Sequence, residues 1–140
     1  QPTQAQRERG VKMKLSAIQA IVKDRRIVMI DDSIVRGTTS RRIVRLLKDA
    51  GAREVHVRIA SPAIQYPCFY GVDTSSREEL ISARKNVDEL CAYLHADSLK
   101  FLAIEDLYTA FQTTHLCCAC FNGSYATPLY DYEQADKKER

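Results

Sequence analysis

One stretch of this chain constrains its fold more than any other, because a short apolar run, a polar loop and an amphipathic segment follow one another. Arg26 to Ile30 is apolar between charged residues, which is typical of a strand buried in a parallel sheet. Glu54 to Ala60 alternates apolar and polar residues, which predicts a second and less buried strand. Between them, apolar residues recur at helical spacing up to Gly51: Ile43, Val44, Leu46, Leu47 and Ala50. Strand, helix and strand within about 35 residues predict a βαβ unit, and hence an α/β fold.

The polar loop after the first strand suits a ligand that is both a sugar and a phosphate ester. It reads Asp31-Asp32-Ser33-Ile34-Val35-Arg36-Gly37-Thr38-Thr39-Ser40. Carboxylates accept hydrogen bonds from sugar hydroxyls and also bind Mg²⁺. Gly37 lets backbone approach an anion, Thr38, Thr39 and Ser40 add hydroxyl donors, and the amides of the next helix complete an anion site. Thr39 or Ser40 is available to cap that helix.

Other classes of site fit this loop less well. A receiver domain of a phosphorelay also opens with an acidic pair, but it needs a phospho-acceptor Asp after a later strand and a distant Lys, and neither can be assigned. The loop lacks the Gly-x-x-x-x-Gly-Lys-Ser/Thr and Gly-x-Gly-x-x-Gly patterns of nucleotide-binding turns. The net charge of +3 is small and both signs are interspersed, so a nucleic-acid partner is not expected. No apolar stretch is long enough to span a bilayer.

The rest of the chain predicts shorter elements. A helix is expected over Ser16 to Val22, and residues 61–74 read as a loop. Two helix starts carry capping-box patterns, Ser75-x-x-Glu78 and Asn86-x-x-Glu89. Leu99 to Ile104 is a candidate strand and Glu105 to Phe111 a candidate helical turn or two.

The cysteines suggest a metal or cluster. Cys117 and Cys120 form a C-x-x-C pair, which by itself is open between zinc, an iron–sulfur cluster, a redox pair and chance. The spacing favours metal over a disulfide framework in a reducing compartment. Cys91 lies in a helical apolar pattern and is expected to be a core residue.

The acidic pair with its Arg-Gly-Thr-Thr-Ser loop resembles the phosphoribosyl diphosphate (PRPP) loop of type I phosphoribosyltransferases. The ten-residue run is most similar to that of the glutamine PRPP amidotransferase family. Flanking segments agree: Gln1-Pro2-Thr3-Gln4, Gly10-Val11-Lys12-Met13-Lys14-Leu15, Ser61-Pro62 and Tyr70-Gly71-Val72-Asp73. The resemblance covers nearly the whole chain and is weakest after residue 125.

The resemblance implies a reaction and a set of ligands. The family transfers glutamine-derived ammonia to C1 of PRPP, giving 5-phosphoribosylamine and diphosphate in the first step of de novo purine biosynthesis. It implies that Asp31 and Asp32 bind Mg²⁺ and the ribose hydroxyls. It places the 5′-phosphate in the loop from Ser33 to Thr39, chiefly at Arg36, Gly37, Thr38 and Thr39. Lys14 is expected to reach the diphosphate from a closing loop. A cytoplasmic homo-oligomer, a tetramer by resemblance, is also implied.

One branch of the family carries a 4Fe-4S cluster, and its ligand pattern matches Cys68 in Pro67-Cys68-Phe69-Tyr70-Gly71 and the pair Cys117 and Cys120. The fourth ligand lies upstream of Gln1 in the family, so we expect poor cluster binding by this chain alone. We also expect a carboxyl-terminal fragment without the glutaminase, which needs a cysteine at a mature amino terminus, and hence no glutamine-dependent turnover. The alternative is a non-catalytic PRPP-binding regulatory module of the same fold.

These expectations divide the chain into four parts. Residues 1–15 form a flexible PRPP-closing loop, and residues 16–74 form the phosphoribosyltransferase α/β portion. Residues 75–125 form a helical region with the cluster cysteines, and residues 126–140 form a polar tail.

Overall fold

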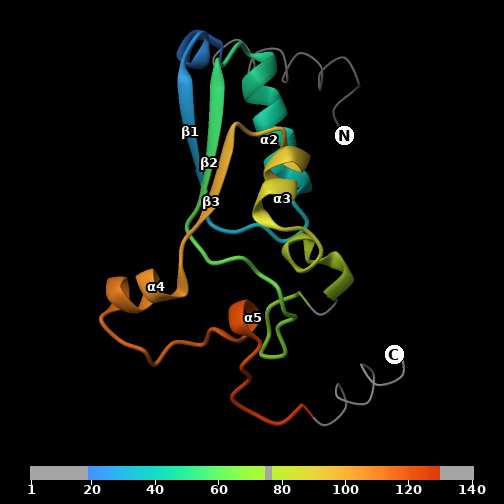
Figure 1. Cartoon of the computed structure of the whole chain (residues 1–140), viewed down its shortest axis with the longest axis vertical. Coiled ribbons are helices and arrows are strands. Elements are labelled where there is room, and N and C mark those ends of the chain that lie inside the picture. The colour runs from blue at the N-terminus through green and yellow to red at the C-terminus, as the bar shows by residue number, and fades with distance from the viewer. Residues whose placement is uncertain (1–18, 75–76, 130–140) are drawn as a thin grey trace, which may run out of the picture.

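The computed structural model describes residues 19–74 and 77–129. Within them lies a parallel sheet in the order β1 (Arg26–Asp31), β2 (Glu54–Ile59) and β3 (Ser98–Phe101). Helices α2 (Thr38–Asp49) and α3 (Val87–Leu94) lie on one side of this sheet (Figure 1). The carboxyl ends of the strands point toward the half of the molecule that holds α4 (Ile104–Phe111) and α5 (Ala119–Asn122). The predicted α/β fold with a parallel sheet and flanking helices is confirmed.

The core forms between the sheet and the two helices. Val44 of α2, Val55 and Val57 of β2, and Leu90 and Leu94 of α3 are all at most 1% exposed. The helical spacing of apolar residues in α2 and their alternation in β2 place these side chains on facing surfaces. Burial of such side chains is the main stabilising contribution to a fold of this size.

The predicted order of strand burial is wrong. β2 is central and buries Val57 completely, whereas β1 is an edge strand whose Val28 and Ile30 are 60% and 74% exposed. Both exposed residues point away from α2 and α3, because alternate residues of a strand face opposite sides of the sheet. The apolar run of β1 therefore predicted a strand buried on both faces. Among the described residues, only the face toward α2 and α3 is covered.

The second predicted helix start is confirmed, whereas Ser75 of the first lies outside the described residues. Asn86 and Glu89 form both hydrogen bonds of a capping box at the start of α3, each 2.9 Å long. The segment before it forms two 3₁₀ turns, η1 (Arg77–Glu79) and η2 (Ile81–Ala83). The Ile81 amide donates 2.9 Å to the carbonyl of Val35 in the polar loop, a tertiary bond that replaces its helical one.

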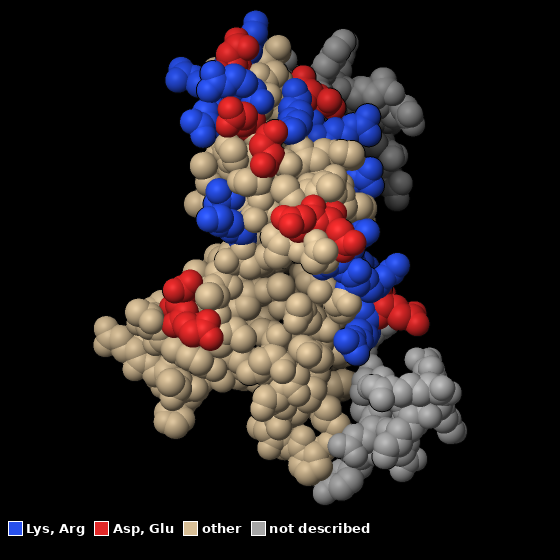
Figure 2. Space-filling model, in the orientation of Figure 1, with Lys and Arg blue, Asp and Glu red and all other residues tan. Residues whose placement is uncertain are grey.

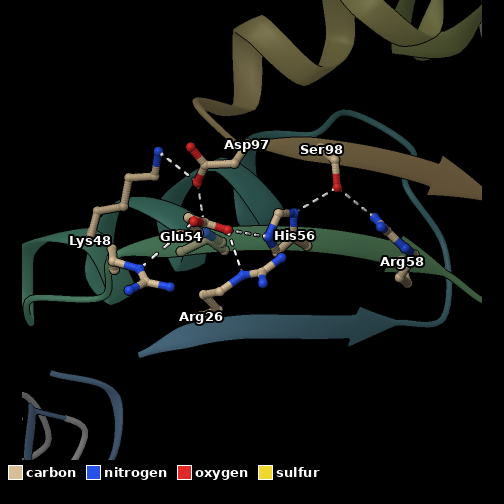
Figure 3. Close-up of polar contacts among 9 residues, drawn as sticks. Arg26, Lys48, Glu54, His56, Arg58, Asp97 and Ser98 are labelled. Carbon is tan, nitrogen blue, oxygen red and sulfur yellow. Dashed lines mark hydrogen bonds and ion pairs between the residues drawn. The ribbon is translucent and has the colours of Figure 1, made fainter. Parts of the chain in front are cut away.

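A polar network lies on the sheet face opposite the helices (Figure 3). Glu54 accepts a 2.8 Å hydrogen bond from Arg26 Nε, and His56 Nε2 lies 2.9 Å from the same carboxylate oxygen. His56 Nδ1 and Arg58 Nη1 both lie 2.9 Å from the hydroxyl oxygen of Ser98. The bond with His56, and then Arg26, lowers the pKa of Glu54. The network links all three strands, from Arg26 of β1 through Glu54 and His56 of β2 to Ser98 of β3.

Charged side chains of both signs lie over the half of the molecule that contains the sheet (Figure 2). On the same face, the half around α4 and α5 is largely uncharged. A search of the described residues identifies no helix with the length and apolar character needed to cross a membrane.

Candidate functional site

The run from Asp31 to Ser40 lines a pocket of about 470 Å³ together with Asp73. β1 ends at Asp31, and the chain turns through the loop before α2 starts at Thr38. Ile34, which is 2% exposed, anchors the loop in the core. The pocket therefore lies outside the carboxyl end of a parallel strand, where open α/β sheets bind their ligands.

The two carboxylates are held by bonds within the loop. Asp31 accepts from the Asp32 amide at 3.1 Å and from the Ser40 hydroxyl at 3.4 Å, so the strand end is tied to the first turn of α2. The Ser33 hydroxyl donates 2.8 Å to Asp32 Oδ1. Asp32 is exposed, and its second carboxylate oxygen has no bonding partner among the described residues. This oxygen is available to a sugar hydroxyl or a cation.

The start of α2 is open to an anion. Gly37 occupies the N-cap position with φ 73°, and no side chain caps the helix, so the predicted cap at Thr39 or Ser40 is wrong. The hydroxyl of Ser40 bonds Asp31 instead. The first helical bond runs from the Arg41 amide to the Gly37 carbonyl at 3.0 Å. The preceding amides of the helix have no acceptor among the described residues, and the first turn holds no acidic residue.

Arg36 points from the loop toward a carboxylate on a different element. Its Nη2 lies 2.7 Å from Oε2 of Glu79 in η1, and the two side chains are 62% and 44% exposed. Glu79, and then Asp73, raise the pKa of Arg36. The guanidinium that lines the pocket is therefore already paired.

The loop that contains Cys68 and the segment from Cys117 to Cys120 lie next to each other. The amides of Gln65 and Tyr66 both donate 3.0 Å to the Cys120 carbonyl of α5, which joins the loop containing Cys68 to the C-x-x-C segment. Burial, followed by the neighbouring thiols of Cys68, Cys117 and Cys118, raises the pKa of Cys120. Cys91 lies apart from them and packs against the core, as predicted.

The thiols have the donor chemistry that an iron–sulfur cluster needs. Among the described residues, however, no group of three or more His, Cys, Asp or Glu is arranged so that it could hold a metal ion. Cys68, Cys117 and Cys120 thus lie in one region of the described chain, but their sulfur atoms do not converge on a common point.

No protein-family model matches the chain. The amidophosphoribosyltransferase of Bacillus subtilis strain 168 is 53% identical over 136 aligned positions, covering 93% of this chain and 29% of that protein. The chain superposes with a TM-score of 0.76 and 48% identity on a structure of the allosteric regulatory enzyme of purine biosynthesis, covering 93% of this chain and 29% of that one. It superposes equally well, at 47% identity, on glutamine PRPP amidotransferase from B. subtilis complexed with ADP and GMP, covering 93% of this chain and 30% of that one.

The chain matches one segment of the amidophosphoribosyltransferases over most of its own length. It spans less than a third of the length of the amidophosphoribosyltransferases that it matches. The predicted resemblance is confirmed, and so is the assignment to the phosphoribosyltransferase region of that family's structures.

The structure brings most of the predicted ligand residues of this chain into one pocket. Those lining it are Asp31, Asp32, Ser33, Arg36, Gly37, Thr38 and Thr39. Lys14 and the predicted closing loop over residues 1–15 lie outside the described residues. Asp73 and Glu79 were not singled out by the sequence. Asp73 belongs to a segment that carries the family resemblance, whereas Glu79 has no local signal because its pairing with Arg36 arises only from the tertiary structure.

Proposed function

We propose that this segment binds PRPP and that the intact protein uses it to transfer glutamine-derived ammonia to C1 of PRPP. The products are 5-phosphoribosylamine and diphosphate, as in the first step of de novo purine biosynthesis. One observation carries the proposal: a single pocket combines an acidic pair at a strand end with an uncapped helix start. A ribose phosphate ester has hydroxyl groups for the first and a phosphate for the second.

Each half of the pocket has a defined task in this proposal. The amides at the start of α2 and the hydroxyls of Thr38 and Thr39 bind the 5′-phosphate, and Gly37 allows its close approach. Asp31 and Asp32 bind the ribose hydroxyls and would hold Mg²⁺, which compensates the charge of the diphosphate when bound. Ser33 keeps Asp32 oriented through its 2.8 Å bond. Lys14 is the proposed diphosphate ligand outside the described residues.

The chemistry requires little covalent participation by the protein. The bond between C1 and the diphosphate oxygen breaks, a C1–N bond forms, and one proton of the ammonia passes to diphosphate or solvent. Catalysis then depends on orientation of C1 and on stabilisation of the departing charge. The loop supplies that orientation because its two ends are joined by the bond between Asp31 and Ser40, and its middle is held by the bond from Ile81 to Val35.

We further propose that Cys68, Cys117 and Cys120 are ligands of a 4Fe-4S cluster in the intact protein, completed by a ligand outside this chain. The closeness of Cys120 to the other thiols and the backbone bonds between the two segments support this. Ordering by a cluster would draw the sulfur atoms together. Assembly as a cytoplasmic homo-oligomer stays a prediction from the family.

The test of the PRPP site is the double substitution Asp31→Asn with Asp32→Asn in the intact protein. Binding of PRPP with Mg²⁺, measured by calorimetry, is expected to fall below detection, because neutral amides bind neither the cation nor the diol as well. The control is Asp24→Asn with Asp49→Asn, which removes the same charge at exposed positions outside the pocket. Unchanged affinity in the Asp31/Asp32 variant contradicts the assignment. PRPP binding by wild-type protein without turnover favours the regulatory module.

A further inference from the structure

The ion pair between Arg36 and Glu79 joins the polar loop from Asp31 to Ser40, called the phosphate loop below, to the 3₁₀ turn η1. Among the residues that the structure describes, Arg36 is the sole basic residue lining the pocket, and the other charged lining residues are Asp31, Asp32 and Asp73. Its guanidinium lies 2.7 Å from Glu79. A cation beside an anion site is expected to turn toward the anion. The pairing of Arg36 with Glu79, a carboxylate outside the pocket lining, therefore needs a reason.

Holding the loop in place is not that reason. The loop is attached to the same segment by the 2.9 Å bond from the Ile81 amide to the Val35 carbonyl. It is also packed there, because a Cβ at Gly37 would lie only 3.1 Å from Ile81 Cδ1 and 3.2 Å from Tyr93 Cε1. An ion pair as exposed as this one adds little stability to such a contact.

The pair does control the charge of the pocket. With Arg36 neutralised by Glu79, the anion must be bound by helix amides and hydroxyls, which are weaker partners than a free guanidinium. Asp73 also lies close enough to attract the guanidinium of Arg36. Together with Glu79, which has the larger effect, it raises the pKa of Arg36.

We propose that Glu79 restrains Arg36 and thereby lowers the affinity of the loop for phosphate esters. Glu79 is then a positioning residue for the proposed PRPP site, on which this inference rests. Restraint keeps the phosphate of the product from being bound too tightly, since binding shared by substrate and product slows release without aiding the chemical step.

The test substitutes Glu79→Gln in the intact protein and measures the affinity for inorganic phosphate and for ribose 5-phosphate by calorimetry. Release of Arg36 is expected to tighten both by about two- to fivefold, the range that an exposed ion pair supports. The gain is expected to shrink at high salt. A gain is informative because a merely disruptive substitution would weaken binding.

The matched control is Glu78→Gln, which removes the same charge from the adjacent residue of η1, where the described residues show no ion pair. It is expected to leave the affinity unchanged. A double-mutant cycle with Arg36→Gln completes the test, because Glu79→Gln is expected to have no effect once Arg36 is gone. An equal gain in the Arg36→Gln background, an equal gain from Glu78→Gln, or weaker or unchanged binding in Glu79→Gln each overturns the restraint.

These outcomes separate this inference from the proposed function. If wild-type protein binds phosphate but not PRPP, and Glu79→Gln tightens phosphate binding, the restraint stands and the PRPP assignment fails. If wild-type protein binds PRPP with Mg²⁺ and Glu79→Gln changes nothing, the PRPP assignment stands and the restraint fails. Absence of phosphate and PRPP binding in both proteins overturns both.

Discussion

Gly37 is the position where the phosphate loop is most sensitive to a small substitution, and Gly37→Ala measures that sensitivity. Its φ of 73° lies in the left-handed region, which costs an alanine about 1–2 kcal/mol. The new Cβ would also lie 3.1 Å from Ile81 and 3.2 Å from Tyr93, contacts that require both side chains to shift. Overpacking of this kind costs about 1–3 kcal/mol, so the free energy of unfolding should fall by about 2–5 kcal/mol in total.

Gly51→Ala separates the two contributions. Gly51 has φ 93°, further from the left-handed minimum than Gly37, so its conformational cost is at least as large. Its Cβ would lie 3.4 Å from Lys23 Cγ and 3.7 Å and 3.8 Å from Lys23 Cα and Cβ, which are ordinary van der Waals distances. Urea unfolding followed by circular dichroism suits a chain without tryptophan. The larger loss is expected for Gly37→Ala. If Gly37→Ala costs no more than its conformational contribution of about 1–2 kcal/mol, the packing of Ile81 and Tyr93 against the loop is not tight, and the reasoning is wrong.

Three further predictions concern other parts of the chain. The Val55 amide at 2.7 Å, and then Lys48 at 3.2 Å, lower the pKa of Asp97. The Asp97 carboxylate therefore stabilises the fold fully above its unfolded pKa of 3.8. That stabilisation is lost as the pH falls through the lower pKa of the folded state. Asp97→Asn should therefore cost about 1 kcal/mol in urea unfolding at neutral pH and little in acid, whereas an equal cost at both would contradict the pairing. Asn86→Ala removes a complete capping box and should lower the free energy of unfolding by about 1 kcal/mol; no change would mean that the cap is not formed in solution. Cys68→Ser should reduce the iron content and visible absorbance of the intact, anaerobically reconstituted protein, while Cys91→Ser should leave both unchanged. Full iron retention in Cys68→Ser would remove Cys68 from the proposed ligand set.

The sequence predicted the βαβ unit and the grouping of the loop residues in one pocket well, because both depend on local rules. Helical spacing fixed the face of α2 that buries Val44, and alternation fixed the face of β2 that buries Val57. The pocket could be predicted from the run Asp31 to Ser40 because its residues are consecutive. They come together wherever a strand ends and a helix begins within the run. Burial of β1 was predicted wrongly, because an apolar run does not say whether both faces of a strand are covered.

Tertiary contacts account for the remaining differences. Capping of α2 by Gly37 in place of Thr39 or Ser40 depends on Ser40 being diverted to Asp31, a bond that requires the loop to be folded. The 3₁₀ turns after residue 76 depend on the bond from Ile81 to Val35, between residues far apart in sequence. Local propensity sets neither bond, because each competes with a helical alternative of similar strength.

The phosphate loop is therefore not a self-contained motif. Its front is the run from Asp31 to Ser40, but its back is formed by Ile81 and Tyr93, which enter the fold after a second strand and a loop. Gly37 can adopt its left-handed conformation in an isolated βαβ peptide, yet nothing there would select that conformation from the many open to glycine. Selection comes from packing against η2 and α3, so the geometry of the anion site is a consequence of the folded domain. The same arrangement puts Glu79 beside Arg36, and the segment that shapes the pocket is thereby also the segment that sets its charge.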